Sequence, residues 1–172
     1  PPIHTVSPNR MLSPAGELRA AVPRAITLGV RLDVGPGTAS FTFAVATQAI
    51  SLGILPHAFS SDIDCRSRTD GPVRSLANAM SKFLAIGLSL PQVIACVTDH
   101  AADGLRLAKK GRLAVGFDAD LTIFDLRRQP VLFTDAENSA LQADQLLTPL
   151  AAIRAGRGYL TEQGRAEHVF DL

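Results

Sequence analysis

Two carboxylates and two hydroxyls stand together in the run AFSSDIDCRSRTDGPV, where they could carry out acid–base chemistry. Asp62 and Asp64 lie two positions apart and follow Ser60 and Ser61, directly after a short apolar stretch. A carboxylate at the end of a buried strand can act as a general base when it lies within hydrogen-bond range of the proton it removes. The same pattern is typical of a solvated acidic turn or a helix cap, so both interpretations stay open from the residues alone.

Candidate metal ligands are sparse in the rest of the chain. The histidines are His4, His57, His100 and His168, and none belongs to a His-x-His pair. A catalytic zinc normally takes three protein ligands and keeps one position for water, and the spacing of these histidines does not identify such a set. His57 precedes a β-prone run and is therefore expected at the opposite end of the strand from Asp62.

Two arginines follow the acidic pair in the same loop. Arg66 and Arg68 could hold a substrate carboxylate in bidentate fashion, or they could form surface salt bridges. The glycine-rich run GPGTAS lacks a lysine in P-loop spacing, so it predicts a tight strand-to-helix turn and not a phosphate site.

The elements that would position these residues alternate between strands and helices. The β-prone runs GVRLDV and HAFSSD are each followed by an amphipathic helical pattern, within SFTFAVATQAISLGI and VRSLANAMSKFLAIGL. This alternation favours parallel pairing, in which reactive side chains lie at the C-terminal ends of the strands. Asp33, Asp62 and Asp64 all lie at or near such ends.

Two more helices are expected on either side of this unit. Ser89 and Gln92 predict a capping box for the helix PQVIACVT. Upstream, a helical stretch is expected to start at Ser13, with its regular part beginning near Ala20 because Pro23 interrupts an earlier start.

The pattern changes after residue 110. The run GRLAVGFDADLTIFDL alternates apolar and polar positions, and VLFT and GRGYLT are two further β-prone runs. This favours a small antiparallel sheet that follows a parallel α/β unit.

Composition narrows the classes of partner. The 172 residues suit about one domain, with 47% apolar residues and 17 basic against 16 acidic side chains. Without a Lys/Arg-rich tract or a long apolar run, neither nucleic acid nor a membrane is an expected partner.

Cys65 and Cys96 are expected to be reduced thiols of a cytoplasmic protein, with Cys96 in the core. The start PPIHTV, without Met, suggests the middle of a longer protein or a cleavage product.

The run KGRLAVGFDADLTIFDL resembles the C-terminal signature of the amidohydrolase superfamily, with Gly116, Ala119 and Asp120 at its characteristic positions. SSDID and the following GPVRSLANAMSKFLAIGLSLPQVIACVT resemble the last barrel strand and helix of the amidohydrolase/deacetylase branch, which includes dihydroorotase-like enzymes. GVRLDVGPGTASFTF resembles the seventh strand and IHTV the end of the sixth. The resemblance implies an α/β fold: the last strands and helices of a (β/α)8 TIM-type metallohydrolase barrel over residues 1–110, and C-terminal strands of a small β-sandwich over residues 111–172.

The resemblance also implies roles for individual residues. Asp62 matches the eighth-strand aspartate, which contacts the metal site, acts as general base toward a metal-activated water and returns the proton to the leaving group. His4 matches the sixth-strand histidine that ligates the metal. The implied cofactor is a divalent metal, zinc foremost, with one or two ions in a complete enzyme. Asp64, Arg66 and Arg68 are weaker candidates for binding the substrate.

The chain departs from the branch at three places. Pro36 and Asp64 stand where the branch usually has histidine, and His100-Ala101-Ala102 stands where it has Asn-Pro-Ala. The sequence is therefore consistent with two functions. The first is the C-terminal part of a metal-dependent hydrolase for an acyl amide, cyclic amide or ester, inactive as this chain alone. The second is a non-catalytic, barrel-derived assembly module. In either case we expect an open sheet edge that pairs with the N-terminal barrel portion, another chain or a second copy.

Overall fold

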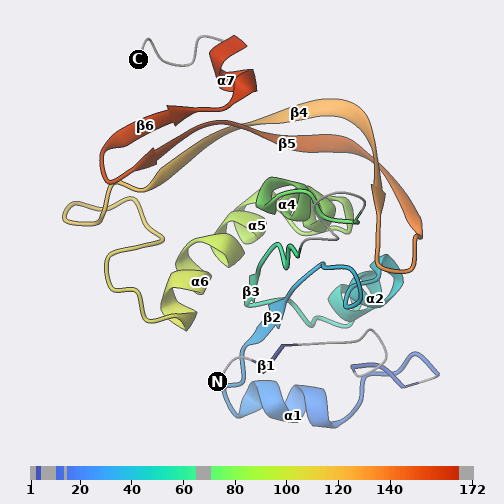
Figure 1. The fold of residues 1–172 in the computed structure, drawn as a ribbon. Helices are drawn as coiled ribbons and strands as arrows, with labels where there is room; N and C mark the ends of the chain where they lie inside the picture. Colours follow the sequence, from blue (N-terminus) through green and yellow to red (C-terminus); the bar gives the residue numbers. More distant parts are fainter. Residues whose placement is uncertain (1–2, 5–10, 14, 65–70, 167–172) are drawn as a thin grey trace.

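A computed structural model describes residues 3–4, 11–13, 15–64 and 71–166 of this protein. Two sheets enclose a layer of helices (Figure 1). The elements are, in order, β1 (Ile3–His4), α1 (Ala21–Thr27), β2 (Leu32–Val34), α2 (Phe43–Ser51), β3 (Ala58–Phe59), α4 (Leu76–Ala85), α5 (Leu90–Val97), α6 (Asp99–Gly104), β4 (Leu121–Thr134), β5 (Ala140–Arg154), β6 (Arg157–Leu160) and α7 (Glu162–Ala166).

The first sheet is parallel, as the alternation of strands and helices predicts. Its strand order is β1-β2-β3, with His4 beside Asp33 and Val34 beside Phe59. The C-terminal ends of the three strands therefore meet at one edge. Within the described residues, β1 and β3 are the two outer strands, so the expected open sheet is confirmed and its pairing with another chain stays a prediction.

Local capping explains where the helices begin. The Ser75 hydroxyl accepts the Asn78 N–H at 3.0 Å and starts α4. At the start of α5, the Gln92 side-chain oxygen accepts the Ser89 N–H at 2.9 Å, which confirms the predicted capping box.

One helical prediction is wrong at its start. The helix α1 begins at Ala21, close to the expected regular part, but Ser13 belongs to a turn and not to a helix. Gly16 has a φ of 79° and its N–H bonds the Ser13 carbonyl at 2.9 Å, while Leu12 and Leu18 form an antiparallel bridge. A glycine in the left-handed region lets the chain reverse here and so ends any early helix.

The second sheet is antiparallel, with order β4-β5-β6, as predicted. Its extent differs from the prediction, because β4 starts only at Leu121 and residues 111–120 form turns. Gly111 and Gly116, with φ of 80° and 86°, break the extended run, and Leu113 and Val115 are exposed. The alternation in this segment therefore does not report a strand with a buried face.

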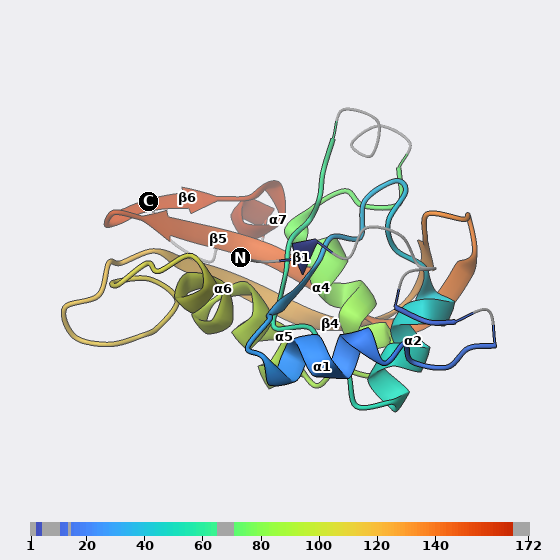
Figure 2. The ribbon, with the colours of Figure 1, turned by 90° about the horizontal axis from the view of Figure 1, so that it is seen from below.

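Helices α4, α5 and α6 form the layer between the two sheets. Viewed from below, they lie behind β2 and β3 and in front of β4 and β5 (Figure 2). The core joins residues of all three layers: Phe41, Phe43, Phe59, Met80, Phe83, Ile86, Leu88, Val93, Cys96, Phe133 and Leu147.

Cys96 is a buried free thiol, as predicted, and burial raises its pKa to about 11. None of the described helices has the length and apolar character that a bilayer crossing requires.

A buried lysine connects this helix layer to the antiparallel sheet. Lys82 on α4 is 0% exposed, and its ammonium donates to the Pro72 carbonyl and, at 2.6 Å, to the Thr134 carbonyl at the end of β4. Burial lowers the pKa of Lys82 to about 8, while the nearby Asp135 carboxylate opposes that shift. The neighbouring Ser81 hydroxyl accepts the Leu147 N–H of β5 at 2.9 Å.

Asp135, in the turn between β4 and β5, makes a second connection between this turn and the helices. Its carboxylate is 2% exposed and accepts the Phe43 N–H, the first of α2, at 3.0 Å. The other carboxylate oxygen accepts the N–H groups of Glu137 and Ser139 at 3.0 and 2.9 Å. The turn is therefore fastened to α2 and α4 by charged groups shielded from water.

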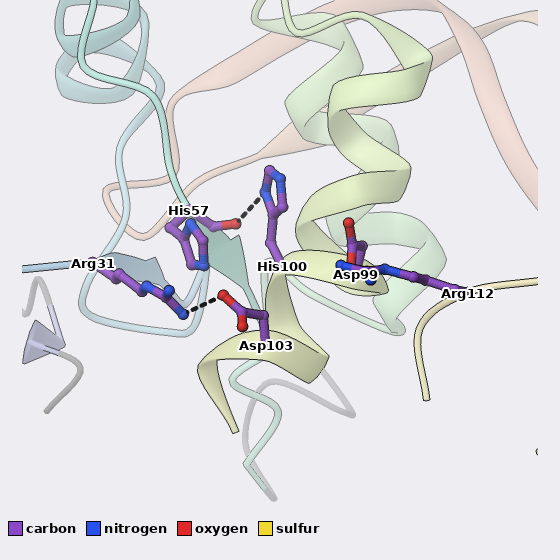
Figure 3. A network of polar contacts seen from close by, with 6 residues as sticks. All are labelled: Arg31, His57, Asp99, His100, Asp103 and Arg112. Atoms are coloured by element: carbon purple, nitrogen blue, oxygen red, sulfur yellow. Dashed lines mark hydrogen bonds and ion pairs between the residues drawn. The ribbon is translucent and has the colours of Figure 1, made fainter. Parts of the chain in front are cut away.

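A second polar cluster lies at the N-terminal end of β3. Figure 3 shows the rings of His57 and His100 face to face, with centroids 4.8 Å apart, and His100 Nδ1 lies 3.0 Å from the His57 carbonyl oxygen. Arg31 forms an ion pair with Asp103 at 2.7 Å beside them. Burial, together with Arg31 and His100, lowers the pKa of His57. As expected, His57 lies at the strand end opposite the one that leads to Asp62.

Replacement of Lys82 by methionine should lower the free energy of unfolding by about 2 to 4 kcal/mol, because it leaves two carbonyls and the Asp135 carboxylate buried without their cation. Urea denaturation followed by circular dichroism measures this. Lys109→Met, at an exposed position, is the matched control and should stay within about 0.5 kcal/mol of the parent protein. Equal stabilities of the two variants would contradict the structural role of Lys82.

The His57 cluster should make stability fall in mild acid. The pKa of His57 is lowered below 6.5 in the folded protein, so the unfolded chain takes up the proton first as the pH falls. The free energy of unfolding should therefore decrease as the pH falls through about 6.5, the ordinary pKa of histidine, and His57→Gln should reduce this decrease. Urea midpoints across that range measure both, and identical pH profiles of variant and parent would show that His57 does not contribute.

Candidate active site

The candidate site lies where the loops after β2 and β3 run side by side at the C-terminal edge of the parallel sheet. The Ser60 N–H donates to the Val34 carbonyl at 3.1 Å and continues the pairing just beyond β3. The loop of residues 35–42 leads from β2 into α2, and residues 60–64 follow β3. Parallel α/β proteins bind ligands at this edge, so side chains here are the ones that could react.

Asp62 is placed by an unusual backbone conformation and by two glycines. Its φ is 49°, in the left-handed region that aspartate tolerates better than most residues. The Asp62 carboxylate lies against Gly35 and Gly37, since a Cβ at Gly37 would collide with it and one at Gly35 would lie 2.8 Å from Asp62 Cβ. Asp62 is nevertheless exposed to solvent.

Two hydroxyls of the first loop meet the two acids of the second. Ser40 Oγ lies 3.2 Å from Asp62 Oδ2, and Thr38 Oγ1 donates to Asp64 Oδ2 at 3.4 Å, a long and weak bond. No pattern in the sequence predicts this pairing. The only signal is the same two-residue spacing of hydroxyls in one loop and of acids in the other.

The loop after β2 is a tight turn, as predicted. Pro36 is fully buried, and Ser40 Oγ donates to the Gly35 carbonyl at 2.8 Å across the turn. A buried proline side chain has no donor atom for a metal or a substrate. The position that carries histidine in the resembled branch therefore has a packing role here.

The structure describes only some of the other residues that the sequence predicts for the site. The backbone of His4 ends β1 and pairs with Asp33, two strands away from Asp62. Arg66 and Arg68 lie outside the residues that the structure describes. Among those it does describe, no group of three or more His, Cys, Asp or Glu side chains is arranged to hold a metal ion.

Two cavities lie near the parallel sheet, and Asp62 lines neither of them. A cavity of about 60 Å³ is lined by Ser40 and by mostly apolar side chains from β2, α2 and α4, and it is too small for a substrate. A larger one, of about 470 Å³, is lined by residues that include Arg31, His57 and His100, and none of its lining residues belongs to the loop of Asp62.

Asp120 has a structural role, as its place in the signature implies. Its carboxylate accepts the Ala155 N–H at 2.9 Å and pairs with Lys110, which lowers the pKa of Asp120. This bond joins the segment before β4 to the turn between β5 and β6.

Several known proteins are similar to this chain. Residues 16–154 match the model of the amidohydrolase family. A deacetylase of Enterococcus faecalis is 38% identical over 136 residues, covering 79% of this chain and 37% of that protein. A deacetylase of Brucella anthropi is 40% identical over 125 residues, covering 73% and 31%. The chain thus spans about a third of the length of these curated relatives.

Solved structures show the same relationship. An adenine deaminase matches 92% of this chain with a TM-score of 0.87 at 34% identity, over 43% of its own chain. A dihydroorotase matches 81% with a TM-score of 0.75 at 35% identity, over 38% of its own chain. In both cases this chain corresponds to less than half of the neighbour's own length. The family model, the deacetylase relatives and these structures together establish that this chain belongs to the amidohydrolase family.

Proposed function

We propose that this chain is the C-terminal part of a metal-dependent amidohydrolase that hydrolyses an acyl amide, a cyclic amide or an ester, with Asp62 as its general base. The placement of the Asp62 carboxylate supports this proposal most directly: it is exposed at the C-terminal edge of the sheet, against two glycines and beside the Ser40 hydroxyl. Residues 1–110 would be the end of the barrel, and residues 111–172 the closing strands of a β-sandwich.

The reaction that fits Asp62 is proton transfer during hydrolysis. As the oxygen of water bonds to the carbonyl carbon, the Asp62 carboxylate accepts a proton from that water. The bond between the carbonyl carbon and the leaving nitrogen or oxygen then breaks, and Asp62 gives the proton to the leaving atom.

The donors in this chain fit part of a divalent-metal site. Imidazole and carboxylate are both ligands of zinc. His4 ends β1, and Asp62 lies in the loop that follows β3 of the same parallel sheet. They would hold the metal together with donors beyond the described residues. When bound, such a metal lowers the pKa of water and polarises the carbonyl group of the substrate.

One observation favours a second function, that of a non-catalytic assembly module. Pro36 is fully buried in the loop that faces Asp62, so this loop supplies no side-chain ligand at that position. An open parallel sheet with outer strands β1 and β3 also suits pairing with another chain. The two functions differ in metal content and in hydrolysis.

Asp62→Asn in the complete protein should lower the rate of hydrolysis by about 10² to 10⁴, because asparagine has the shape of aspartate but cannot accept the proton. Rates on a panel of acyl amides, cyclic amides and esters measure this. Asp144→Asn, at an exposed position on β5, is the matched control and should keep full activity. Metal analysis of the same preparations should give about one to two equivalents of divalent metal. A complete protein without metal and without hydrolysis would favour the assembly module.

A further inference from the structure

We propose that Ser40 is a positioning residue for Asp62, holding its Oδ2 atom so that Oδ1 is left for the reaction. This inference rests on the proposed function, because it assigns the orientation of the same carboxylate. Ser40 Oγ lies 3.2 Å from Asp62 Oδ2, and within the described part of the chain no other donor bonds the Asp62 carboxylate.

The Ser40 hydroxyl is itself fixed to the sheet. It lies 2.8 Å from the Gly35 carbonyl, immediately after β2, as well as 3.2 Å from Asp62 Oδ2. A hydroxyl has one proton to donate, so the two acceptors share it. Because Gly35 continues directly from the strand, the contact places the carboxylate relative to the sheet and not merely relative to a loop.

The backbone next to Ser40 is also anchored. Phe41 is 3% exposed, and its carbonyl accepts the Ala136 N–H from the turn between β4 and β5 at 3.0 Å. Asp135 in the same turn holds the Phe43 N–H at 3.0 Å. The hydroxyl is therefore presented from a rigid segment, which is what a group that orients a catalytic side chain needs.

The glycines opposite Asp62 make this contact possible. Any side chain at Gly37 would collide with the carboxylate, and one at Gly35 would crowd Asp62 Cβ. With the left-handed φ of 49° at Asp62, the carboxylate is directed onto the loop that carries Ser40. The Asp62 carboxylate thus packs against the two glycines, and its polar contact is with the Ser40 hydroxyl.

The test compares Ser40→Ala and Ser40→Thr in the complete protein. We expect Ser40→Ala to lower kcat by about tenfold to 10²-fold with KM nearly unchanged, since a misplaced catalytic group slows chemistry more than binding. Ser40→Thr keeps the hydroxyl and should recover most of kcat. Ser51→Ala is the matched control, because its hydroxyl also bonds a backbone carbonyl at 2.8 Å but lies at the far end of α2.

A structural defect is separated from misplacement by Ser40→Val, which has the shape of threonine without the hydroxyl. Valine should behave as alanine does, and equal kcat values for the threonine and valine variants would overturn the proposal. So would an unchanged kcat in Ser40→Ala.

A second measurement does not depend on hydrolysis. The carboxyl carbon of Asp62 in a protein labelled with ¹³C-aspartate, assigned with Asp62→Asn, should change its chemical shift in Ser40→Ala but not in Ser51→Ala. An unchanged signal would overturn the positioning role whatever the activity. If the signal shifts but Asp62→Asn hydrolyses normally, the positioning contact stands and the proposed function fails.

Discussion

The buried ammonium of Lys82 is the interaction on which the rest of this structure depends. It bonds Pro72, which precedes α4, and Thr134, which ends β4. Asp135 lies next to Thr134 and holds the first N–H of α2. The loops after β2 and β3, which carry the candidate site, lead into α2 and α4. Lys82 and Asp135 therefore hold the ends of both loops that lie next to these helices.

Burying the Lys82 ammonium costs free energy, but its position lets it bond two separate segments of the chain. The pKa of Lys82 falls from 10.5 to about 8, so desolvation exceeds the attraction of Asp135 by an amount equivalent to roughly 3 kcal/mol. An apolar side chain of similar size would avoid that penalty, but it could not bond two carbonyls from separate segments. The lysine therefore specifies which segments meet, whereas the surrounding hydrophobic core contributes the apolar burial.

Sequence patterns predict the features that depend on near neighbours. The parallel strands, α2, α4, the Ser89–Gln92 capping box and the place of Asp62 after β3 all follow from local periodicity or short spacing. The contact between Phe43 and Asp135 joins residues 92 positions apart, and that between Ser40 and Asp62 joins residues 22 apart. No local pattern encodes such pairs. The same limit explains the error at residues 111–120, where alternation resembles a strand but two glycines with positive φ form turns.

The loop of Pro36 shows how the site can differ from its family while the fold stays the same. Proline fixes its own φ and has no N–H to donate, so the turn after β2 is rigid but lacks one backbone bond. The Ser40 hydroxyl bridges that turn to the Gly35 carbonyl and reaches Asp62 at the same time. Compared with a histidine at position 36, this loop has no side chain there that can bind a metal, and its contact with the opposite carboxylate is made by Ser40. Under the function that we propose, Asp62 would act at this edge of the sheet together with ligands supplied by other strands.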